Sequence, residues 1–360
     1  MVIDAMDRMK QKIKNLWKLC FNDSEEFVEM YFRLRYHNDV NIAIESGEEV
    51  IAALQMLPYP MTFGGEKIKT SYISGACTHP AHRNQGTMGA LLSQAFMRML
   101  DGGVALSALI PAEPWLFGYY TRYGYAPVFN YKASDFVVAD IPAPNQGGYA
   151  LKMDDQCEEK EYEYLNRKLG ERAYCIQHTN KDFRVILADL RLGQGHVCTL
   201  FEEGSARQKD DTMQGKERIV ALAVVYPAGG NKWRIGEIVS DSSETRTLLL
   251  QNICRELNVP SVEVLAPLAA GEAGLPLGMA RVINAKDMLD LYAAIHPEEE
   301  TCICLTDEHI CGNNGCYHLS GGKCMKSAKC LPGRHLALTI GELTAKIFET
   351  SSPYMSLMVN

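Results

Sequence analysis

The sequence predicts an α/β (α+β) protein made of three successive units. Segments with helical and strand-like periodicity alternate along its 360 residues, which exceed what one hydrophobic core usually serves. Two stretches interrupt the alternation, the Pro- and Gly-rich residues 141–149 and the glycine-punctuated residues 271–278. We therefore expect units at residues 1–140, 141–272 and 273–360.

The first unit opens with two helices. Apolar residues recur at helical spacing up to Cys20, and Asp23 with Glu26 three residues later has the pattern of a capping box before a second helix. Alternating runs at residues 41–57 and 61–78 follow, each broken by a glycine turn. These runs are typical of two hairpins or a meander.

The rest of the first unit alternates helix and strand. After a glycine-containing loop, apolar residues within positions 88–99 form one face of a helix that ends before Gly102. A short buried strand at residues 104–110 and a short helix at residues 112–120 are expected next.

The second unit is again of the α/β type but contains no glycine-rich phosphate loop. We expect helices near residues 158–169 and 243–257, and strands near residues 197–201, 219–226, 235–239 and 261–265. In the third unit, strand-like alternation surrounds an Asn314-Gly315 turn, and a helix over residues 340–348 closes the pattern.

Composition excludes several classes of protein. With 47% hydrophobic and 22% charged residues the chain is neither disordered nor of low complexity. A net charge of -8 argues against a nucleic-acid partner, which would require clustered Lys and Arg. No apolar run approaches the ~18 residues of a membrane helix, and the N-terminus lacks the apolar core of a signal peptide. We therefore expect a cytoplasmic protein that does not bind membranes.

The 12 cysteines are spread through the chain, and without an export signal reduced thiols are expected. Six of them lie between Cys302 and Cys330, beside His309 and His318. This run contains one C-x-C followed by irregular gaps, whereas a zinc site usually shows paired C-x-x-C knuckles. We therefore expect buried strand cysteines and no metal, with a metal site as the alternative.

The strongest functional signal lies between Ser71 and Leu92. There a strand is followed by a loop, and the residues from Arg83 to Gly86 open a helix, so that backbone N–H groups of residues 84–89 converge at the positive end of that helix. Arg83 adds a positive charge, and Gly86 allows close approach of a phosphate to the backbone. This arrangement suits a pyrophosphate.

The stretch Arg83-Asn84-Gln85-Gly86-Thr87-Met88 resembles the acetyl-CoA loop of the GNAT acetyltransferases, which reads R/Q-x-x-G-x-G/A. Met88 replaces the last Gly or Ala, with Gly89 one residue later, and this departure is shared by the narrower Eis-like (enhanced intracellular survival) group. The residues Tyr120-Thr121-Arg122-Tyr123-Gly124-Tyr125 resemble a second motif of that group, Y-x-R/K-F/Y-G-Y/F.

The resemblance implies acetyl-CoA as the cosubstrate and a chain of two tandem GNAT-like domains, the second degenerate, followed by a sterol-carrier-like α+β domain. Strand residues Ala76, Cys77 and Thr78 would lie along the pantetheine arm, with one backbone N–H polarising the acetyl carbonyl. The phosphate-binding residues would be Arg83, Asn84, Gln85, Gly86, Thr87, Met88 and Gly89.

The same resemblance assigns the general acid to Tyr120, because a phenol with a pKa near ~10 can protonate a departing thiolate. The alternative is a structural aromatic in a cluster with its neighbouring tyrosines.

In the Eis-like group the base is the terminal carboxylate, which here is that of Asn360, although the relatives end in an aromatic residue. A frayed terminus is the alternative for Asn360, and Glu113 is an alternative base. His79 and His82 are expected to be loop or packing residues, with a base role as the alternative, and Cys77 is expected to be a small apolar filler rather than a nucleophile.

We therefore expect an acetyl-CoA-dependent N-acetyltransferase that transfers acetyl directly to a primary amine in a ternary complex. An aminoglycoside, polyamine, lysine or peptide amine would each fit, and homo-oligomers are implied by the family. The alternative is a non-catalytic protein that binds an acyl-CoA or a hydrophobic ligand.

Overall fold

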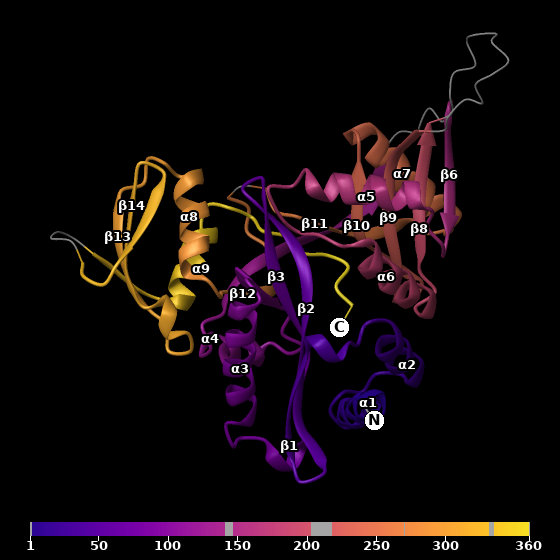
Figure 1. Cartoon of the computed structure of the whole chain (residues 1–360). Helices are drawn as coiled ribbons and strands as arrows, with labels where there is room; N and C mark the ends of the chain where they lie inside the picture. The colour runs from indigo at the N-terminus through magenta and orange to yellow at the C-terminus, as the bar shows by residue number, and fades with distance from the viewer. Residues whose placement is uncertain (1, 141–146, 203–217, 270, 331–334, 360) are drawn as a thin grey trace.

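The computed structural model describes residues 2–140, 147–202, 218–269, 271–330 and 335–359. Within them the strands form one large mixed sheet of 12 strands and a separate sheet of 4. Figure 1 shows helices packed along the large sheet, and the small sheet standing to one side with α8 and α9. The protein is thus of the α+β class, as the sequence predicts.

The N-terminal group of elements begins with two helices and continues with antiparallel strands. The elements are α1 (Val2–Cys20), α2 (Glu25–Leu34), η1 (Asn38–Val40), β1 (Asn41–Ser46), β2 (Glu49–Phe63), β3 (Glu66–Thr78), η2 (Pro80–His82), α3 (Thr87–Asp101), β4 (Leu106–Leu109), α4 (Trp115–Thr121), β5 (Ala126–Val137) and η3 (Val138–Asp140). The predicted order of helices and strands is therefore correct up to α4, whereas the strand β5 was not predicted.

The start of α2 differs from the prediction by one residue. Ser24 is the N-cap, and its Oγ accepts a hydrogen bond from the backbone N–H of Phe27 at 3.2 Å. Asp23 accepts a hydrogen bond from Trp17 Nε1 at 2.7 Å instead. The carboxylate thus ties α1 to the turn, and the neighbouring hydroxyl caps the helix.

Helices cover both faces of the N-terminal strands. Ala53 and Cys77 pack against Trp17 of α1 on one face, whereas Leu54 and Ile73 belong to the cluster that contains α3 on the other. This division follows from the alternation of side chains along a strand. The segment from β2 to α3 is therefore the centre of a three-layered arrangement.

The second group repeats part of this order of elements. It comprises β6 (Tyr149–Asp154), α5 (Glu159–Gly170), β7 (Tyr174–Ile176), α6 (Asn180–Leu192), β8 (His196–Glu202), β9 (Arg218–Gly229), β10 (Lys232–Ser240), α7 (Ser243–Glu256) and β11 (Ser261–Ala266). β10 runs parallel to β11 across helix α7, as β3 runs parallel to β4 across helix α3. Both halves thus contain two helices, three antiparallel strands, a helix and a parallel strand in this order, whereas β6 and β7 have no counterpart in the first group.

The strand β12 (Leu275–Val282) lies between β4 and β5 and is antiparallel to both. β5 pairs with β12 along its first half and with β11 along its second. The large sheet therefore runs without a break across the predicted boundaries at residues 140 and 272, and the division into units at those positions stays a prediction.

The third group forms the small sheet. Its elements are α8 (Ala285–Ile295), β13 (Thr301–Thr306), η4 (Cys311–Asn313), β14 (Gly315–Ser320), β15 (Lys323–Ser327), β16 (Leu336–Thr339) and α9 (Ile340–Phe348). The strand order is β15-β14-β13-β16. One face of this sheet packs on α8 and α9, through Ile303 and Tyr317 among others.

A buried ion pair joins the small sheet to the large one. Arg281 Nη2 donates to Asp307 Oδ1 at 2.7 Å, and both side chains are 0% exposed. The Asp307 carboxylate also accepts hydrogen bonds from the backbone N–H groups of His309 and Ile310 and from Asn313 Nδ2. Four hydrogen-bond donors thus satisfy this buried carboxylate.

The C-terminal segment returns to the large sheet. Tyr354 forms a parallel bridge with Cys175, and Ser356 Oγ donates to the buried Glu237 carboxylate at 2.6 Å. Val359 packs in the cluster that contains Met30 of α2. Figure 1 shows this final stretch passing into the space between β2 and the second group of elements.

In the part of the chain described here, no helix combines the length and the apolar character needed to cross a membrane.

Candidate active site

A gap opens between β3 and β4. The two strands are paired only at Thr70–Tyr72 with Leu106–Ala108. Beyond this point β3 contains a bulge, because Gln55 of β2 pairs with Ser74 but Ala53 pairs with Cys77. The extra residue bends β3, and its carboxyl end no longer pairs with β4.

Glycine is required in the bulge. Gly75 has a φ of 60°, and a Cβ at this position would lie 2.1 Å from a ring carbon of Trp17. A side chain is therefore excluded both by the backbone conformation and by α1.

The bulged strand directs backbone donors into the gap. The N–H of His79 donates to the carbonyl of Ile51 in β2 at 2.8 Å. Successive residues of a strand point their N–H groups to opposite sides, so those of Ala76 and Thr78 point away from β2, into the gap. Of the three predicted strand residues, Ala76 and Thr78 thus offer backbone donors, and the buried Cys77 side chain faces α1.

The predicted phosphate loop forms an exposed turn at the start of α3. Asn84 and Gly86 have φ values of 61° and 78°, and Gly86 is the N-cap without a side-chain hydrogen bond. Among the described residues, none accepts a hydrogen bond from the N–H groups of Thr87, Met88 and Gly89. These donors lie at the positive end of the α3 dipole and can bind an anion.

Arg83 and Gln85 are held against the loop. Arg83 Nε donates to the carbonyl of Thr78 at 3.2 Å, and Gln85 Nε2 donates to the carbonyl of Ala81 at 3.2 Å. The Arg83 guanidinium therefore lies beside the end of β3, where it adds a positive charge to the mouth of the gap.

Gly89 connects the two sequence motifs. A Cβ at Gly89 would lie 2.5 Å from the hydroxyl of Tyr123, which belongs to the second motif. The glycine that follows Met88 is therefore required by contact with α4 and its following turn. Sequence reasoning missed this role, since nothing in the spacing of the two motifs shows that they touch.

Tyr120 lies on α4 and is 8% exposed. Its ring contacts those of Tyr119 and Tyr125, with centroids 5.3 and 5.7 Å away. Burial, with a smaller effect of a nearby Cys77 charge, raises the pKa of Tyr120 to about 12. The phenol is therefore protonated at neutral pH, and it lies near the strand whose N–H groups enter the gap.

The neighbouring tyrosines have structural partners. Tyr125 shares a hydrogen bond of 2.7 Å with Ser107 Oγ in the core, and the carbonyl of Tyr123 accepts from Arg281 Nε at 2.8 Å. In contrast, no described residue forms a hydrogen bond with the Tyr120 hydroxyl. Within the cluster, Tyr120 is the phenol best placed to give its proton to a substrate.

Cys20 is a part of this site that sequence reasoning missed. Its Sγ donates to the carbonyl of Thr78 at 3.4 Å. A hydrogen bond with Cys77 lowers the pKa of Cys20 to about 7, aided by the Arg83 guanidinium and opposed by burial. The same contact and burial raise the pKa of Cys77 well above its usual value. In the sequence, Cys20 is only the last apolar residue of a helix.

This pKa predicts a selective reaction. Iodoacetamide attacks the thiolate, so the alkylation rate of Cys20 should rise with pH through a midpoint near 7. Cys157 is a matched control, because burial raises its pKa. Peptide mass spectrometry should show Cys20 modified first, and acetyl-CoA should slow this modification several-fold. Equal rates for Cys20 and Cys157 would contradict the assignment.

The predicted bases are dispersed. Glu113 is exposed in the bend before α4. His79 Nδ1 accepts a hydrogen bond from the N–H of Ala81, and the rings of His79 and His82 meet edge to face with centroids 5.7 Å apart. The histidines thus shape the loop. Asn360 lies outside the described residues, so its role as the base stays a prediction.

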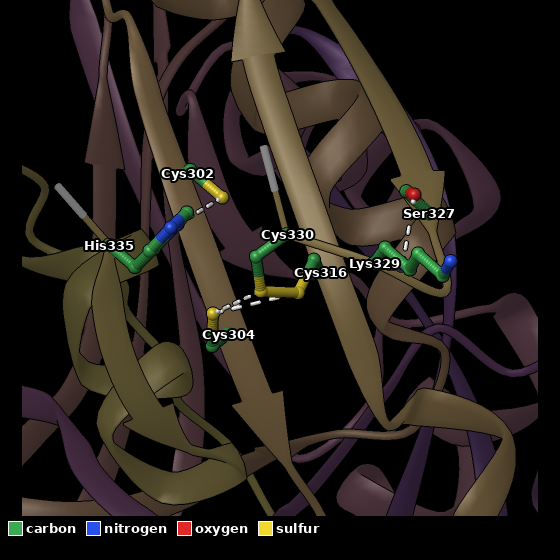
Figure 2. The surroundings of a disulfide bond; sticks show 7 residues. All are labelled: Cys302, Cys304, Cys316, Ser327, Lys329, Cys330 and His335. Carbon is green, nitrogen blue, oxygen red and sulfur yellow. Dashed lines mark hydrogen bonds between the residues drawn. A yellow bond between two sulfur atoms is a disulfide. The ribbon is translucent and has the colours of Figure 1, made fainter. Parts of the chain in front are cut away.

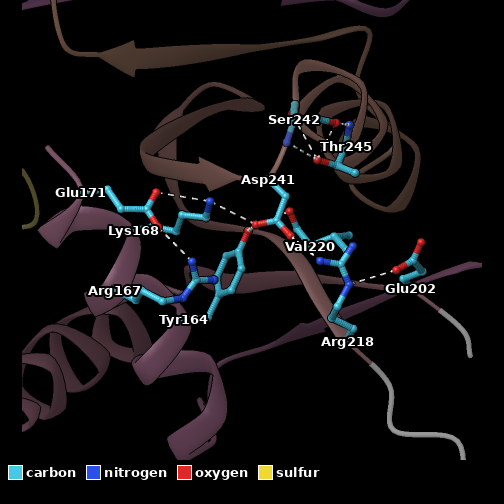
Figure 3. Close-up of polar contacts among 10 residues, drawn as sticks. All are labelled: Tyr164, Arg167, Lys168, Glu171, Glu202, Arg218, Val220, Asp241, Ser242 and Thr245. Carbon is cyan, nitrogen blue, oxygen red and sulfur yellow. Dashed lines mark hydrogen bonds and ion pairs between the residues drawn. The ribbon is translucent and has the colours of Figure 1, made fainter.

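In the described residues of the second half of the large sheet, the corresponding strand-to-helix turn has no such site. Only Asp241 and Ser242 separate β10 from α7, and Ser242 Oγ caps the helix by accepting from Thr245 N at 3.2 Å (Figure 3). Asp241 is bound by Lys168 at 3.1 Å and Arg218 at 2.9 Å (Figure 3). A capped helix end beside a carboxylate does not attract a phosphate.

A cavity of about 1080 Å³ lies elsewhere, between α2, α6 and the amino-terminal part of β3. Its lining includes Arg35, Tyr59, Lys69 and Asp182 but none of the predicted site residues. It is therefore distinct from the gap between β3 and β4.

Comparison with known proteins agrees with this geometry. Residues 2–128 match the acetyltransferase (GNAT) domain family. A probable N-acyltransferase of unknown function from Enterococcus faecalis V583 is similar in structure, with 16% identity, 96% coverage of each chain and a TM-score of 0.72. A GCN5-related N-acetyltransferase from Kribbella flavida has 16% identity and a TM-score of 0.73, with 97% of this chain and 95% of that chain covered.

Eis1 from Mycobacterium abscessus is also similar, with 13% identity, a TM-score of 0.65, and coverage of 91% of this chain and 88% of its own. A search of the curated proteins found no match. These structures share the fold of the chain, and the domain match covers residues 2–128. Over these residues the chain is thus similar to the acetyltransferase (GNAT) domain family, whose members use an acyl-CoA as cosubstrate.

Proposed function

We propose that this protein transfers an acetyl group from acetyl-CoA directly to a primary amine. The observation that carries the proposal is the convergence of three features on one gap. They are the N–H groups at the start of α3 and the phenol of Tyr120, for which no described residue is a hydrogen-bond partner, and the outward N–H groups of bulged β3. Each suits a different part of acetyl-CoA.

Binding of the cosubstrate would use the α3 end and the strand. The N–H groups of Thr87, Met88 and Gly89 and the Arg83 guanidinium would hold the pyrophosphate. The N–H groups of Ala76 and Thr78 would pair with the pantetheine arm, much as an added strand would. One of them would polarise the acetyl carbonyl.

Tyr120 would act as the general acid. An amine attacks the polarised carbonyl, the C–S bond breaks, and the departing thiolate takes the phenol proton. Burial that raises the pKa of Tyr120 to about 12 also raises that of a thiolate in the same gap, so the proton affinities of the two groups move together. Direct transfer needs no cysteine nucleophile, in agreement with the raised pKa of Cys77.

The acceptor is proposed only as a class. Aminoglycosides, polyamines, lysine and peptide amines all carry the required primary amine, and the net charge of -8 slightly favours a polycationic one. The Eis-like resemblance suggests that the terminal carboxylate of Asn360 would take the proton of the amine. The carboxylate of Glu113 is the alternative base.

We also propose that the chain is a tandem GNAT-like protein of the Eis-like type. Three facts support this proposal: the element order is repeated, the second repeat has a capped helix in place of the loop, and α8 and α9 cover a small carrier-like sheet. A cytoplasmic location would suit the 10 free cysteines of the described chain, and homo-oligomers would follow from the family.

The proposal is tested by calorimetric binding of acetyl-CoA and by mass spectrometry of a panel of amines incubated with protein and acetyl-CoA. Acetylated product that depends on the protein is expected. Binding without product from any amine would favour the alternative, a non-catalytic acyl-CoA-binding protein. If acetyl-CoA does not bind and no product forms, both the acetyltransferase proposal and the binding-protein alternative are contradicted.

The loop arginine makes a further prediction. Arg83→Gln removes a charge-assisted contact with the pyrophosphate, so the Kd for acetyl-CoA measured by calorimetry should rise about tenfold. Arg255→Gln is a matched control, because Arg255 is an exposed arginine on α7. An equal change in both variants would show a general charge effect and contradict the predicted contact.

A further inference from the structure

Cysteine thiols gather on the outer face of the small sheet. Ile303 and Leu305 of β13 face the helices, so Cys302 and Cys304 point to the opposite face. Cys304 is paired with Cys316 of β14. Three segments thus contribute to one patch, since Cys330, after β15, also reaches it (Figure 2).

The donor atoms are close together. Cys316 and Cys330 are joined by a disulfide, and Cys304 Sγ lies 2.8 Å from Cys330 Sγ and 3.6 Å from Cys316 Sγ. His335 Nδ1 lies 3.0 Å from Cys302 Sγ, as Figure 2 shows. The donors of Cys302, Cys304, Cys330 and His335 all lie within 4.8 Å of one another.

We propose that this cluster is a structural zinc site, formed when the disulfide is reduced. Cys302, Cys304, Cys316 and Cys330 would be the four ligands, with the imidazole of His335 bound to the Cys302 sulfur by a hydrogen bond. Tetrahedral zinc with Zn–S bonds of about 2.3 Å places its sulfurs ~3.8 Å apart, close to the spacing of Cys304 and Cys316.

The chemistry of the donors selects the metal. Thiolates favour zinc over magnesium or calcium, and four protein ligands leave no position for a substrate, so the site would stabilise the sheet rather than catalyse. A disulfide accounts for only two of the sulfurs on this face.

Formation of the zinc site from the disulfide form requires a dithiol reductant. The dithiol gives two electrons and two protons to the Cys316–Cys330 disulfide, becoming a disulfide itself, and each of the four thiols then loses its proton to bind Zn²⁺. The site carries a formal charge of about −2. Cys302 and Cys304 are partly exposed and Cys330 is exposed, so the ion has access.

Sequence analysis expected no metal here, because the gaps between the cysteines are irregular. The strand pairing explains how irregular spacing gives a compact set. The parallel pairing of Ile303 with Leu336 places His335 beside Cys302, and the pairing of β13 with β14 brings Cys316 to Cys304.

The test uses the full-length protein reduced with dithiothreitol, incubated with Zn²⁺ and freed of excess metal by gel filtration. Elemental analysis should find about one zinc per chain. Cobalt in place of zinc should give the absorption of tetrahedral thiolate-bound Co²⁺. Cys304→Ser should reduce the bound zinc at least tenfold, and Cys311→Ser, an exposed thiol outside the cluster, should leave it unchanged.

His335→Gln distinguishes the ligand set and guards against a variant that merely unfolds. It should retain about one zinc, since His335 is not a ligand. Loss of zinc in His335→Gln would overturn the assignment of four thiolates. Reduced wild-type protein that binds no more zinc than Cys304→Ser, or a disulfide that persists in the reductant, would overturn the site itself.

Discussion

Tyr120→Phe is expected to lower kcat about 100-fold or more, while the Kd for acetyl-CoA stays within about twofold. The substitution removes one hydroxyl, for which the structure describes no hydrogen-bond partner, and keeps the ring contacts with Tyr119 and Tyr125. The variant should therefore lack the proposed proton donor but keep the stability of the fold. Initial rates of acetylated product and calorimetric binding measure the two parameters separately.

Tyr119→Phe is the matched control, because Tyr119 is the adjacent residue and its hydroxyl makes only a long contact of 3.5 Å with that of Tyr123. Its kcat should stay within about twofold of the wild-type value. Equal losses of kcat in Tyr120→Phe and Tyr119→Phe would contradict the assignment.

A raised pKa of about 12 also means that the acid form of Tyr120 persists to high pH, so the rate should not fall through ionisation of this phenol below about pH 10.

Asp307→Ala is expected to lower the free energy of unfolding by about 3–5 kcal/mol. The change leaves the 0% exposed guanidinium of Arg281 without its anion, together with the N–H groups of His309 and Ile310. Buried donors that lose their acceptor bear the full cost of desolvation. Urea titration followed by circular dichroism measures the difference.

Two further variants sharpen this test. Asp307→Asn keeps an acceptor for the backbone donors and loses only the charge, so its loss should be smaller than that of Asp307→Ala. Asp290→Ala breaks the exposed pair with Lys286 on α8 and should cost less than about 0.5 kcal/mol. If Asp307→Ala were no more destabilising than Asp290→Ala, the ion pair would not join the two sheets as described.

The loop and the helix after it could be predicted because the information is local. A strand, the residues Arg83 to Gly86 and an apolar helix face are contiguous, and the direction of the N–H groups follows from helix geometry alone. The motif also singled out Tyr120, whose role as the acid stays a prediction. In these parts the chain needs no distant partner to build the geometry.

The rest of the site depends on distant contacts. Cys20 reaches Thr78 only because α1 packs across β3, and Gly89 touches Tyr123 only because α4 folds back on α3. Register and crossover are set by tertiary packing, which no periodicity in a single segment encodes. The ion pair of Arg281 with Asp307 was missed for the same reason, since it links two sheets.

The position of β12 has a consequence for how the chain is made. A ribosome releases β4 and β5 long before it reaches Leu275, yet β12 fills the place between them. Until that strand emerges, the nascent N-terminal part carries two unsatisfied strand edges, which are open to wrong pairing. Synthesis order and sheet order thus disagree, and this part of the large sheet can be completed only after Val282 has left the ribosome.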